Sequence, residues 1–206
     1  MTLQEFFKEN PKTALAFSGG VDSSYLLYAA REYGAQVRAY YVKTAFQPEF
    51  EYQDALRLAK QLGAEVEVLE LNALSDPKVV ENPANRCYYC KQNIFGNIWR
   101  AARADGYTVL LDGTNASDQV ADRPGMQALR ELEVRSPLRE AGLTKAQIRE
   151  LSYAAGLFTW DKPSYACLAT RIPTGVEITP EKLERTEWAE EYLKTLGFSD
   201  LRVRLY

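Results

Sequence analysis

The sequence contains no histidine among its 206 residues. Histidine is the side chain whose ordinary pKa lies closest to neutrality, so an acid–base step near pH 7 must here use Asp, Glu, Cys, Lys or the substrate itself. A zinc site would also have to be assembled from cysteine and carboxylate ligands alone. The missing histidines therefore narrow both the general bases and the metal ligands that this chain can offer.

Long apolar runs and an excess of positive charge are also absent. No apolar stretch approaches the roughly 20 residues that a membrane-spanning helix requires, and the first residues lack a signal-peptide pattern. The net charge is −3, which argues against a protein whose main task is binding nucleic acid. We therefore expect a cytoplasmic globular protein that binds neither a membrane nor a nucleic acid.

Cysteine is scarce, with Cys87, Cys90 and Cys167 as its three positions. In a cytoplasmic protein free thiols are expected rather than structural disulfides. A pair spaced like Cys87 and Cys90 is typical of half a zinc site, half a cluster site or a redox disulfide. Three thiolates are also the number that holds a [4Fe–4S] cluster with one iron left open. The residues alone leave these alternatives open.

The surroundings of Cys167 are rich in positive charge along the sequence. Lys162 lies five residues before this cysteine and Arg171 four residues after it. A positive environment lowers the pKa of a thiol and makes it more nucleophilic, so we expect a lowered pKa at Cys167. The alternative is a small buried residue, which is a common role for a free cysteine.

Short β-rich runs alternate with helical patterns in the first part of the chain. The spacing of the apolar residues predicts strands over residues 13–17, 36–42, 64–71 and 107–113, and helices over 21–33, 48–62 and 90–104. This alternation predicts an α/β fold with a doubly wound parallel sheet, covered by helices on both faces.

The second part of the chain has a different pattern. It predicts helices over residues 124–133 and 144–155, a loop rich in Pro and Gly, a helix from Thr179-Pro180 to Gly197, and a lone strand at 201–206. A single strand is not stable alone. We therefore expect one domain over residues 1–175, followed at 176–206 by a linker helix and the first strand of a small C-terminal domain that the chain contains only in part.

The most specific local pattern follows the first predicted strand and comprises Ser18, Gly19, Gly20, Val21, Asp22 and Ser23. The two glycines let backbone N–H groups approach a ligand, and the start of the next helix favours an anion. The serine hydroxyls add donors, and Asp22 can hold a magnesium ion against phosphates. No lysine follows the glycines as in a Walker loop, and the third glycine of a dinucleotide fingerprint is missing. The alternative is a Gly-Gly turn with a serine cap.

A second polar segment, DGTNASD, follows the fourth predicted strand. Its candidates for holding magnesium, phosphates or substrate are Asp112, Thr114, Asn115 and Asp118. The carboxyl ends of parallel strands meet at one edge of the sheet, so we expect this segment to lie beside the glycine loop. The alternative is a turn rich in Asx residues.

The loop SGGVDS resembles the pyrophosphate loop of the PP-loop ATP pyrophosphatase superfamily. Longer segments resemble one family within it, the LarE family of ATP-dependent sulfurtransferases that act on pyridinium-3,5-biscarboxylic acid mononucleotide and help build the nickel-pincer nucleotide of lactate racemase. These segments are NRCYYCK (85–91), LLDGTNASDQVADRPGMQAL (110–129), RSPLREAGLTKAQIREL (135–151), KPSYACLATRIPTG (162–175) and LRVR (201–204).

The resemblance implies that ATP is cleaved to AMP and pyrophosphate, that a substrate carboxylate is adenylated, and that sulfur then replaces an oxygen. In some family members one cysteine, matching Cys167, sacrifices its own sulfur. Others hold a [4Fe–4S] cluster with three cysteines, matching Cys87, Cys90 and Cys167, and transfer an extra sulfide. Because all three are present, the resemblance places this chain in the cluster-dependent branch.

The resemblance also assigns roles to the remaining candidates. It implies catalytic roles for the three cysteines and Asp22, and ATP with Mg²⁺ at residues 18–23, with Asp112 and Thr114 binding the nucleotide and Asp22 and Asp118 the metal. It further implies a sulfide donor and a homo-oligomer. The residues expected to bind or orient the nucleotide substrate are Arg123, Arg171, Glu190, Arg202 and Arg204.

Two other functions compete with this interpretation. The first keeps the chemistry but acts on tRNA, and it requires a basic face or an RNA-binding domain that the sequence does not show. The second is a regulatory module that binds a nucleotide or zinc, with cysteines that are only structural. It predicts stoichiometric zinc and no turnover of ATP.

Overall fold

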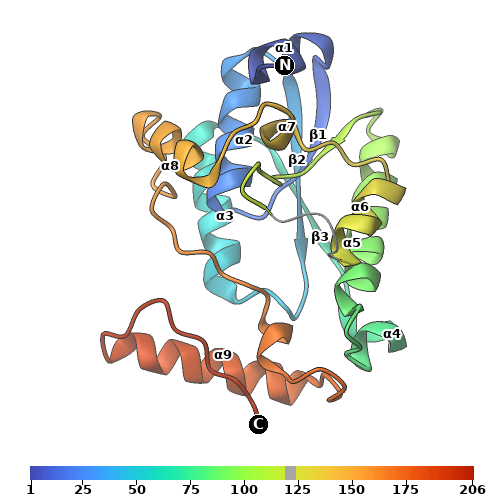
Figure 1. The fold of residues 1–206 in the computed structure, drawn as a ribbon, viewed down its shortest axis with the longest axis vertical. Coiled ribbons are helices and arrows are strands. Elements are labelled where there is room, and N and C mark those ends of the chain that lie inside the picture. The colour runs from blue at the N-terminus through green and yellow to red at the C-terminus, as the bar shows by residue number, and fades with distance from the viewer. Residues whose placement is uncertain (119–123) are drawn as a thin grey trace.

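The computed structural model describes residues 1–118 and 124–206. Its centre is a four-stranded parallel sheet in the order β3-β2-β1-β4 (Figure 1). The strands are β1 (Lys12–Ala16), β2 (Gln36–Lys43), β3 (Val66–Glu70) and β4 (Leu110–Leu111). The predicted α/β fold with a parallel sheet is therefore confirmed.

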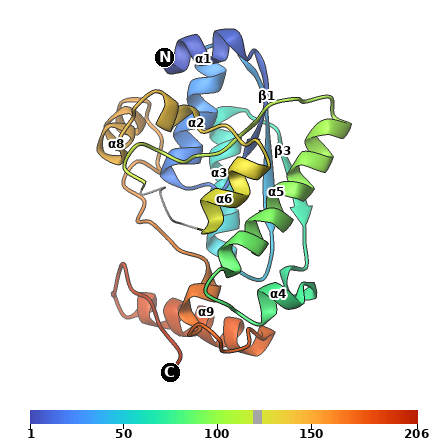
Figure 2. The ribbon, with the colours of Figure 1, turned by 45° about the vertical axis from the view of Figure 1, so that its right-hand side comes forward.

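Helices cover both faces of this sheet (Figures 1 and 2). The α-helices are α1 (Leu3–Glu9), α2 (Val21–Glu32), α3 (Glu49–Leu62), α4 (Pro77–Val80), α5 (Arg86–Ala104), α6 (Pro124–Glu131), α7 (Pro137–Glu140), α8 (Lys145–Ala154) and α9 (Pro180–Thr195), and the 3₁₀ helices are η1 (Ala73–Ser75) and η2 (Leu168–Arg171). Side chains alternate along each strand. On β1, Leu15 joins the core under α1, α2 and α3, whereas Ala14 joins the core under α5 and α6.

A third apolar core lies beyond the carboxyl ends of the strands. Phe46, which follows β2, packs there with Leu168 of η2 and with Leu183 of α9. In Figure 1 the helix α9 and the C-terminus lie at the opposite end of the molecule from α1. This core contains residues from both sides of position 175, and the predicted domain division at that position stays a prediction.

The tail at residues 201–206 corrects the sequence-based expectation, because these described residues form no strand. Their backbone groups bond elsewhere: the N–H of Val203 donates to Oε1 of Glu190 at 2.9 Å, and the N–H of Leu205 donates to the carbonyl of Arg171 at 2.9 Å. The tail is therefore extended against α9 and η2 without a sheet partner.

Two other boundaries differ from the prediction. The fourth strand is two residues long: only Leu110 and Leu111 pair with β1, and the N–H of Asp112 donates to the carbonyl of Arg135 at 2.9 Å. Helix α5 begins at Arg86 rather than at Cys90. Both Cys87 and Cys90 consequently lie in the first turns of one helix. No helix of the described residues is long and apolar enough to cross a membrane.

Candidate functional site

The glycine loop connects β1 to α2 in a conformation that only glycine suits. Gly19 has a φ of +72°, and a Cβ atom built there would lie 2.7 Å from the Cβ of Ala55 on α3. Gly20 has an ordinary φ of −78° and caps the N-terminus of α2. The positive φ of Gly19 turns the chain sharply, and its close approach to α3 leaves no room for a side chain. The loop residues and the positive end of α2 therefore line the same space.

The serines of the loop bond to each other. The two hydroxyls of Ser18 and Ser23 lie 3.0 Å apart, and the Ser23 hydroxyl donates to the carbonyl of Gly20 at 3.3 Å. The N–H of Gly20 lies 3.4 Å from Oγ of Ser18. The hydroxyls therefore hold the loop in shape before a ligand arrives.

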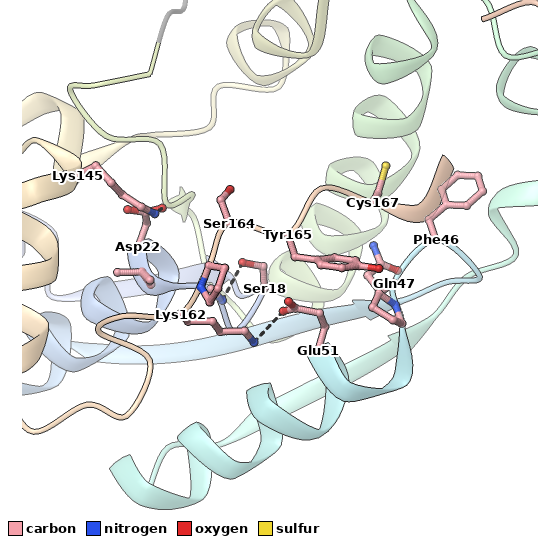
Figure 3. A pocket seen from close by; sticks show the side chains of 14 residues that line it. Ser18, Asp22, Phe46, Gln47, Glu51, Lys145, Lys162, Ser164, Tyr165 and Cys167 are labelled. Atoms are coloured by element: carbon pink, nitrogen blue, oxygen red, sulfur yellow. Dashed lines mark hydrogen bonds and ion pairs between the residues drawn. The ribbon is translucent and has the colours of Figure 1, made fainter. Parts of the chain in front are cut away.

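The loop opens into a cavity of about 280 Å³ at the carboxyl edge of the sheet. Figure 3 shows Asp22 and Lys145 at one end of this space and Cys167 at the other. The other walls come from the segment after β2 and from the Pro-rich segment before Cys167. The lining residues outside the loop are Phe46, Gln47, Pro48, Glu51, Lys145, Lys162, Pro163, Ser164, Tyr165 and Cys167. A candidate phosphate loop and a thiol thus share one cavity.

Asp22 makes two polar contacts inside this cavity. Nζ of Lys145 lies 2.6 Å from Oδ2 of Asp22, and Nδ2 of Asn115 donates to Oδ1 at 3.2 Å. Sequence analysis missed Lys145, although a capping box at Thr144 marks it as the first residue of a helix. Nothing in the sequence shows that this helix start meets the glycine loop. The ammonium group that the loop lacks is supplied by α8.

In the segment after β4, some side chains bond only within the segment and its surroundings, whereas one contacts the glycine loop. Asp112 is buried and accepts hydrogen bonds from the hydroxyl of Ser136 at 2.6 Å and from that of Thr114 at 2.5 Å. Asp118 accepts from the N–H of Asn115 at 2.9 Å, and Asn115 in turn contacts Asp22. Of these side chains, Asn115 is the one that the structure connects to the glycine loop. The nucleotide and magnesium roles of Asp112, Thr114 and Asp118 stay predictions.

Lys162 lies in the wall of the cavity, between two carboxylates of α3. Its Nζ is 2.8 Å from Oε2 of Glu51 and 2.8 Å from Oδ2 of Asp54 (Figure 3 shows the first pair). All three side chains are largely buried. The positive charge that the sequence places near Cys167 is therefore neutralised by α3.

The three cysteines differ in exposure. Cys87 is exposed and lines a second cavity, of about 340 Å³, together with Lys91, Thr114 and Asp118. Cys90 and Cys167 are partly buried and pack against the third apolar core. No group of three or more His, Cys, Asp or Glu residues within the described ranges is placed to hold a metal ion.

Burial decides the protonation of the inner thiols. It raises the pKa of Cys90 to about 12, and the neighbouring sulfurs of Cys167 and Cys87 act in the same direction. Burial also raises the pKa of Cys167, although the guanidinium of Arg86 opposes it. The expected lowering of the Cys167 pKa is thus wrong. The physical reason is that burial of the thiol outweighs the lowering effect of the nearby guanidiniums of Arg86 and Arg171.

Arg171 and Glu190 form a fully buried ion pair. Nε of Arg171 donates to Oε1 of Glu190 at 2.7 Å, and Nη2 donates to Oε2 at 3.1 Å. Glu190 also accepts from the hydroxyl of Tyr165, and Nη1 of Arg171 donates to the carbonyls of Ala166 and Cys167 at 2.7 and 3.3 Å. The pair fixes the backbone around Cys167. This geometry favours a positioning role for both residues over contact with substrate.

Arg202 and Arg204 are both exposed on the tail. Nη2 of Arg202 donates to the carbonyl of Ser164 at 2.8 Å. Ser164 lines the cavity into which the glycine loop opens. Glu190 holds the backbone of Val203, which lies between the two arginines. These contacts hold the tail in place, with the Arg202 guanidinium beside the cavity wall. Arg123, which was also expected to contact substrate, lies outside the described residues.

Comparison with known proteins agrees with this geometry. Residues 8–159 match the family model described as asparagine synthase. An uncharacterized protein of Synechocystis is 40% identical over 98% of this chain and 76% of its own length. The pyridinium-3,5-bisthiocarboxylic acid mononucleotide synthase of Lactiplantibacillus plantarum is 32% identical over 100% of this chain and 75% of its own length. A tRNA-specific 2-thiouridylase of Thermotoga neapolitana is 25% identical over 58% of this chain and 40% of its own length.

The parallel sheet, the SGGVDS loop at its carboxyl edge and the match over residues 8–159 define the chain as an ATP-using enzyme of the PP-loop class. Within that class it belongs to the LarE family, to which the resemblance of its segments pointed. It is an ATP-dependent sulfurtransferase.

Proposed function

We propose that this enzyme adenylates the carboxylates of pyridinium-3,5-biscarboxylic acid mononucleotide and replaces oxygen by sulfur, giving thiocarboxylates for the nickel-pincer nucleotide. The observation that carries the proposal is that Cys167 and the SGGVDS loop line one cavity. The relative from L. plantarum, whose name describes the synthesis of the bisthiocarboxylic product, supports the choice of substrate. The loop activates the carboxylate, and the thiol end of the cavity supplies sulfur.

In the proposed first step ATP binds with its phosphates on the glycine loop. The N–H groups at the start of α2 and the ammonium of Lys145 stabilise the leaving pyrophosphate. Asp22 provides carboxylate oxygens suited to Mg²⁺, and the side-chain N–H₂ of Asn115 donates to one of them. A substrate carboxylate oxygen then attacks the α-phosphorus, and pyrophosphate departs.

In the proposed second step a sulfur nucleophile attacks the acyl carbon and AMP departs. The cavity walls Phe46, Pro163 and Tyr165 restrict water, which would otherwise hydrolyse the adenylate. Arg202 and Arg204 hold the substrate phosphate, because two exposed guanidiniums that lie two residues apart on the tail suit a phosphate group. Arg171 and Glu190 position the reacting groups indirectly: Arg171 holds the backbone at Cys167, and Glu190 holds the backbone at Val203, between the two arginines of the tail.

We propose that the sulfur is held by Cys87, Cys90 and Cys167 as the three ligands of a [4Fe–4S] cluster. The donor set suits such a group, because the three thiols influence one another's charge and two of them pack on the same apolar core. When bound, the cluster supplies an open iron that carries the sulfide to be transferred. In the alternative mode Cys167 gives up its own sulfur.

The experiment uses the purified enzyme with ATP, Mg²⁺ and the biscarboxylic acid mononucleotide, after anaerobic loading with iron and sulfide. We expect AMP, pyrophosphate and a thiocarboxylate detected by mass spectrometry. A gain of dehydroalanine at position 167 would instead establish the sacrificial mode, and ADP as product would contradict the proposal. AMP release that depends on added tRNA would establish tRNA thiolation. The cytoplasmic location, the homo-oligomer and the sulfide donor stay predictions.

A further inference from the structure

Arg149 of α8 holds the backbone of the segment that leads to Cys167. Its Nη1 donates to the carbonyl of Trp160 at 2.7 Å, and its Nη2 donates to the carbonyl of Lys162 at 2.8 Å. Lys162 precedes Pro163, which disfavours a helical backbone at residue 162, so the carbonyl there needs a partner outside a helix. The guanidinium fork of Arg149 supplies this partner and holds two carbonyls in one fixed geometry.

The side chain of Lys162 is held by a second helix, α3. Its ammonium lies 2.8 Å from Oε2 of Glu51 and 2.8 Å from Oδ2 of Asp54. Residue 162 is thus fixed twice, through its carbonyl by α8 and through its ammonium by α3. We call the contacts of Lys162 with Arg149, Glu51 and Asp54 the Lys162 clasp. All of them are charge-assisted, so they restrain the backbone more strongly than neutral hydrogen bonds would.

The two helices of the clasp also contact the glycine loop. On α8, one turn before the arginine of the clasp, the ammonium of Lys145 lies 2.6 Å from Oδ2 of Asp22. On α3, Ala55 directly follows the aspartate of the clasp. It lies so close to Gly19 that a Cβ atom built there would be 2.7 Å from the Cβ of Ala55. The same two helices therefore fix the glycine loop and residue 162, and they set the distance between them.

The segment that follows Lys162 forms one wall of the cavity. Pro163, Ser164, Tyr165 and Cys167 all line the cavity together with the glycine loop, and Figure 3 shows this segment from Lys162 to Cys167. The C-terminal end of the wall is held by the buried ion pair of η2 and α9, and the clasp holds the other end. In the proposed second step this wall keeps water from the adenylate. A wall that could move away from the glycine loop would admit water to the acyl carbon.

We propose that Arg149 is a positioning residue of the reaction: through the Lys162 clasp it fixes the cavity wall relative to the glycine loop, and so decides whether the adenylate meets sulfur or water. The inference rests on the proposed function for the identity of the adenylate. When water enters, its oxygen attacks the acyl carbon, the bond from that carbon to the AMP oxygen breaks, and AMP departs. A proton is released and the substrate carboxylate is formed again. ATP and water then give AMP and pyrophosphate without sulfur transfer.

The test compares Arg149→Met and Asp54→Asn with Gln61→Met as the matched control. Nε2 of Gln61, also on α3, donates to the carbonyl of Gly156 at 2.9 Å, in the same connecting segment but farther along the chain from the cavity wall. The first measurement is the lifetime of the adenylate in the chain without iron or sulfide, followed by quenched single turnovers from pyrophosphate formation to AMP release. The second is the amount of thiocarboxylate formed per AMP after anaerobic loading with iron and sulfide. Both are counted per adenylate formed, so a smaller folded fraction does not change them.

We expect Arg149→Met to shorten the adenylate lifetime about tenfold and to lower thiocarboxylate per AMP by a similar factor, because small misplacements around a reacting centre have effects of this size. Asp54→Asn removes one ion pair of the clasp and should shift both quantities in the same direction by about threefold. Gln61→Met should match the wild type in both. If Arg149→Met matches the wild type in both, or Gln61→Met shifts both as far as Arg149→Met does, the inference is wrong.

Failure of the proposed function can be told apart from failure of this inference. A wild type that forms pyrophosphate but no thiocarboxylate contradicts the sulfur-transfer part of the proposed function, while the adenylate lifetimes still decide the role of Arg149. A wild type that forms no pyrophosphate contradicts the proposed function and this inference together. If Arg149→Met does not fold, Asp54→Asn decides: an adenylate lifetime shortened about threefold supports the inference, and a wild-type lifetime contradicts it.

Discussion

The ammonium group of Lys145 lies 2.6 Å from a carboxylate oxygen of Asp22. The two residues are 123 positions apart in the sequence, and each lies in the first turn of a helix, α2 and α8, on the same face of the sheet. The glycine loop contains no lysine of its own. The contact therefore completes the loop with a cation at the place where pyrophosphate would bind.

Replacement of Lys145 tests this contact. We expect Lys145→Met to reduce AMP formation about 100-fold, because a positioned cation stabilises the negative charge that develops on the leaving pyrophosphate. Lys8→Met is the control, since Lys8 lies in the last turn of α1 and is exposed. AMP and pyrophosphate are measured by chromatography under saturating substrate. A Lys145→Met enzyme with wild-type AMP formation would show that the contact with Asp22 is only structural.

The conformation of Gly19 predicts a loss of stability on substitution. In Gly19→Ala the new Cβ would lie 2.8 Å from the backbone Cα of Ala55 and the residue would keep a φ of +72°. We expect the free energy of unfolding to fall by more than about 2 kcal/mol, combining backbone strain with overpacking. The matched control is Gly34→Ala, with a φ of +76° but no described atom within 4 Å of its Cβ. That change should cost about 1 kcal/mol in urea unfolding. Equal costs would contradict the clash.

The sequence pattern predicts the first three strands of the sheet, but it does not predict the length of β4 or the conformation of the tail. The alternation of apolar runs with helix signals predicts β1, β2 and β3 because parallel strands need buried side chains on both faces. The pairing of β4 with β1 ends after Leu111, and the next N–H, that of Asp112, bonds to Arg135, which is distant in the sequence. The tail at 201–206 alternates like a strand, yet its N–H groups bond to Glu190 and Arg171. At the end of β4 and in the tail, tertiary contacts rather than the local sequence pattern determine which groups the backbone bonds to.

The part of the site that could be predicted from the sequence is the part whose functional residues lie in one continuous segment. Residues 18–23 show glycine, serine and aspartate in one unbroken loop, so local spacing identifies them. Lys145 could not be found in this way, because only folding brings the start of α8 to Asp22. The Cys167 pKa was predicted in the wrong direction, because sequence proximity to Arg171 does not show that folding buries the thiol against the third apolar core.

The buried pair of Arg171 and Glu190 predicts a large effect of one uncharged substitution. Glu190→Gln should lower the free energy of unfolding by about 3–5 kcal/mol, because it leaves a buried guanidinium without its anion. Glu184→Gln, at an exposed position on the same helix, should change stability by less than about 0.5 kcal/mol. Urea unfolding measures both. Loss of protection in hydrogen exchange at residues 203–205 should accompany Glu190→Gln, and equal stability of the two variants would contradict this account.

The same pair predicts a pH dependence. Burial alone would raise the pKa of Glu190, but hydrogen bonds from Arg171, Tyr165 and the N–H of Val203 outweigh it and lower the pKa. The stabilisation is therefore present above the unfolded pKa of about 4.3 and is lost as pH falls through the lower folded value. The wild type should lose stability below about pH 4.3 more steeply than Glu190→Gln. Equal slopes in unfolding experiments from pH 6 to pH 3 would contradict a lowered pKa.

Burial of the thiols predicts an order of alkylation in the metal-free chain. Exposed Cys87 should react first with iodoacetamide at pH 8, and Cys90, with a pKa raised to about 12, should react at least about 100-fold more slowly. The rate at Cys90 should rise about tenfold per pH unit between pH 8 and pH 10, because its thiol stays protonated there. Mass spectrometry of peptides follows each site. A plateau at Cys90 near pH 9 would show an ordinary thiol.

The central claim is that one cavity both adenylates a carboxylate and delivers sulfur from its Cys167 end. The most direct measurement follows AMP and thiocarboxylate together in the wild type and in Cys167→Ala, with ATP, Mg²⁺ and the biscarboxylic acid mononucleotide. We expect wild-type enzyme to form both products, and Cys167→Ala to form AMP by adenylation and hydrolysis but no thiocarboxylate. Thiocarboxylate formation by Cys167→Ala at the wild-type rate would contradict the claim, as would ADP in place of AMP.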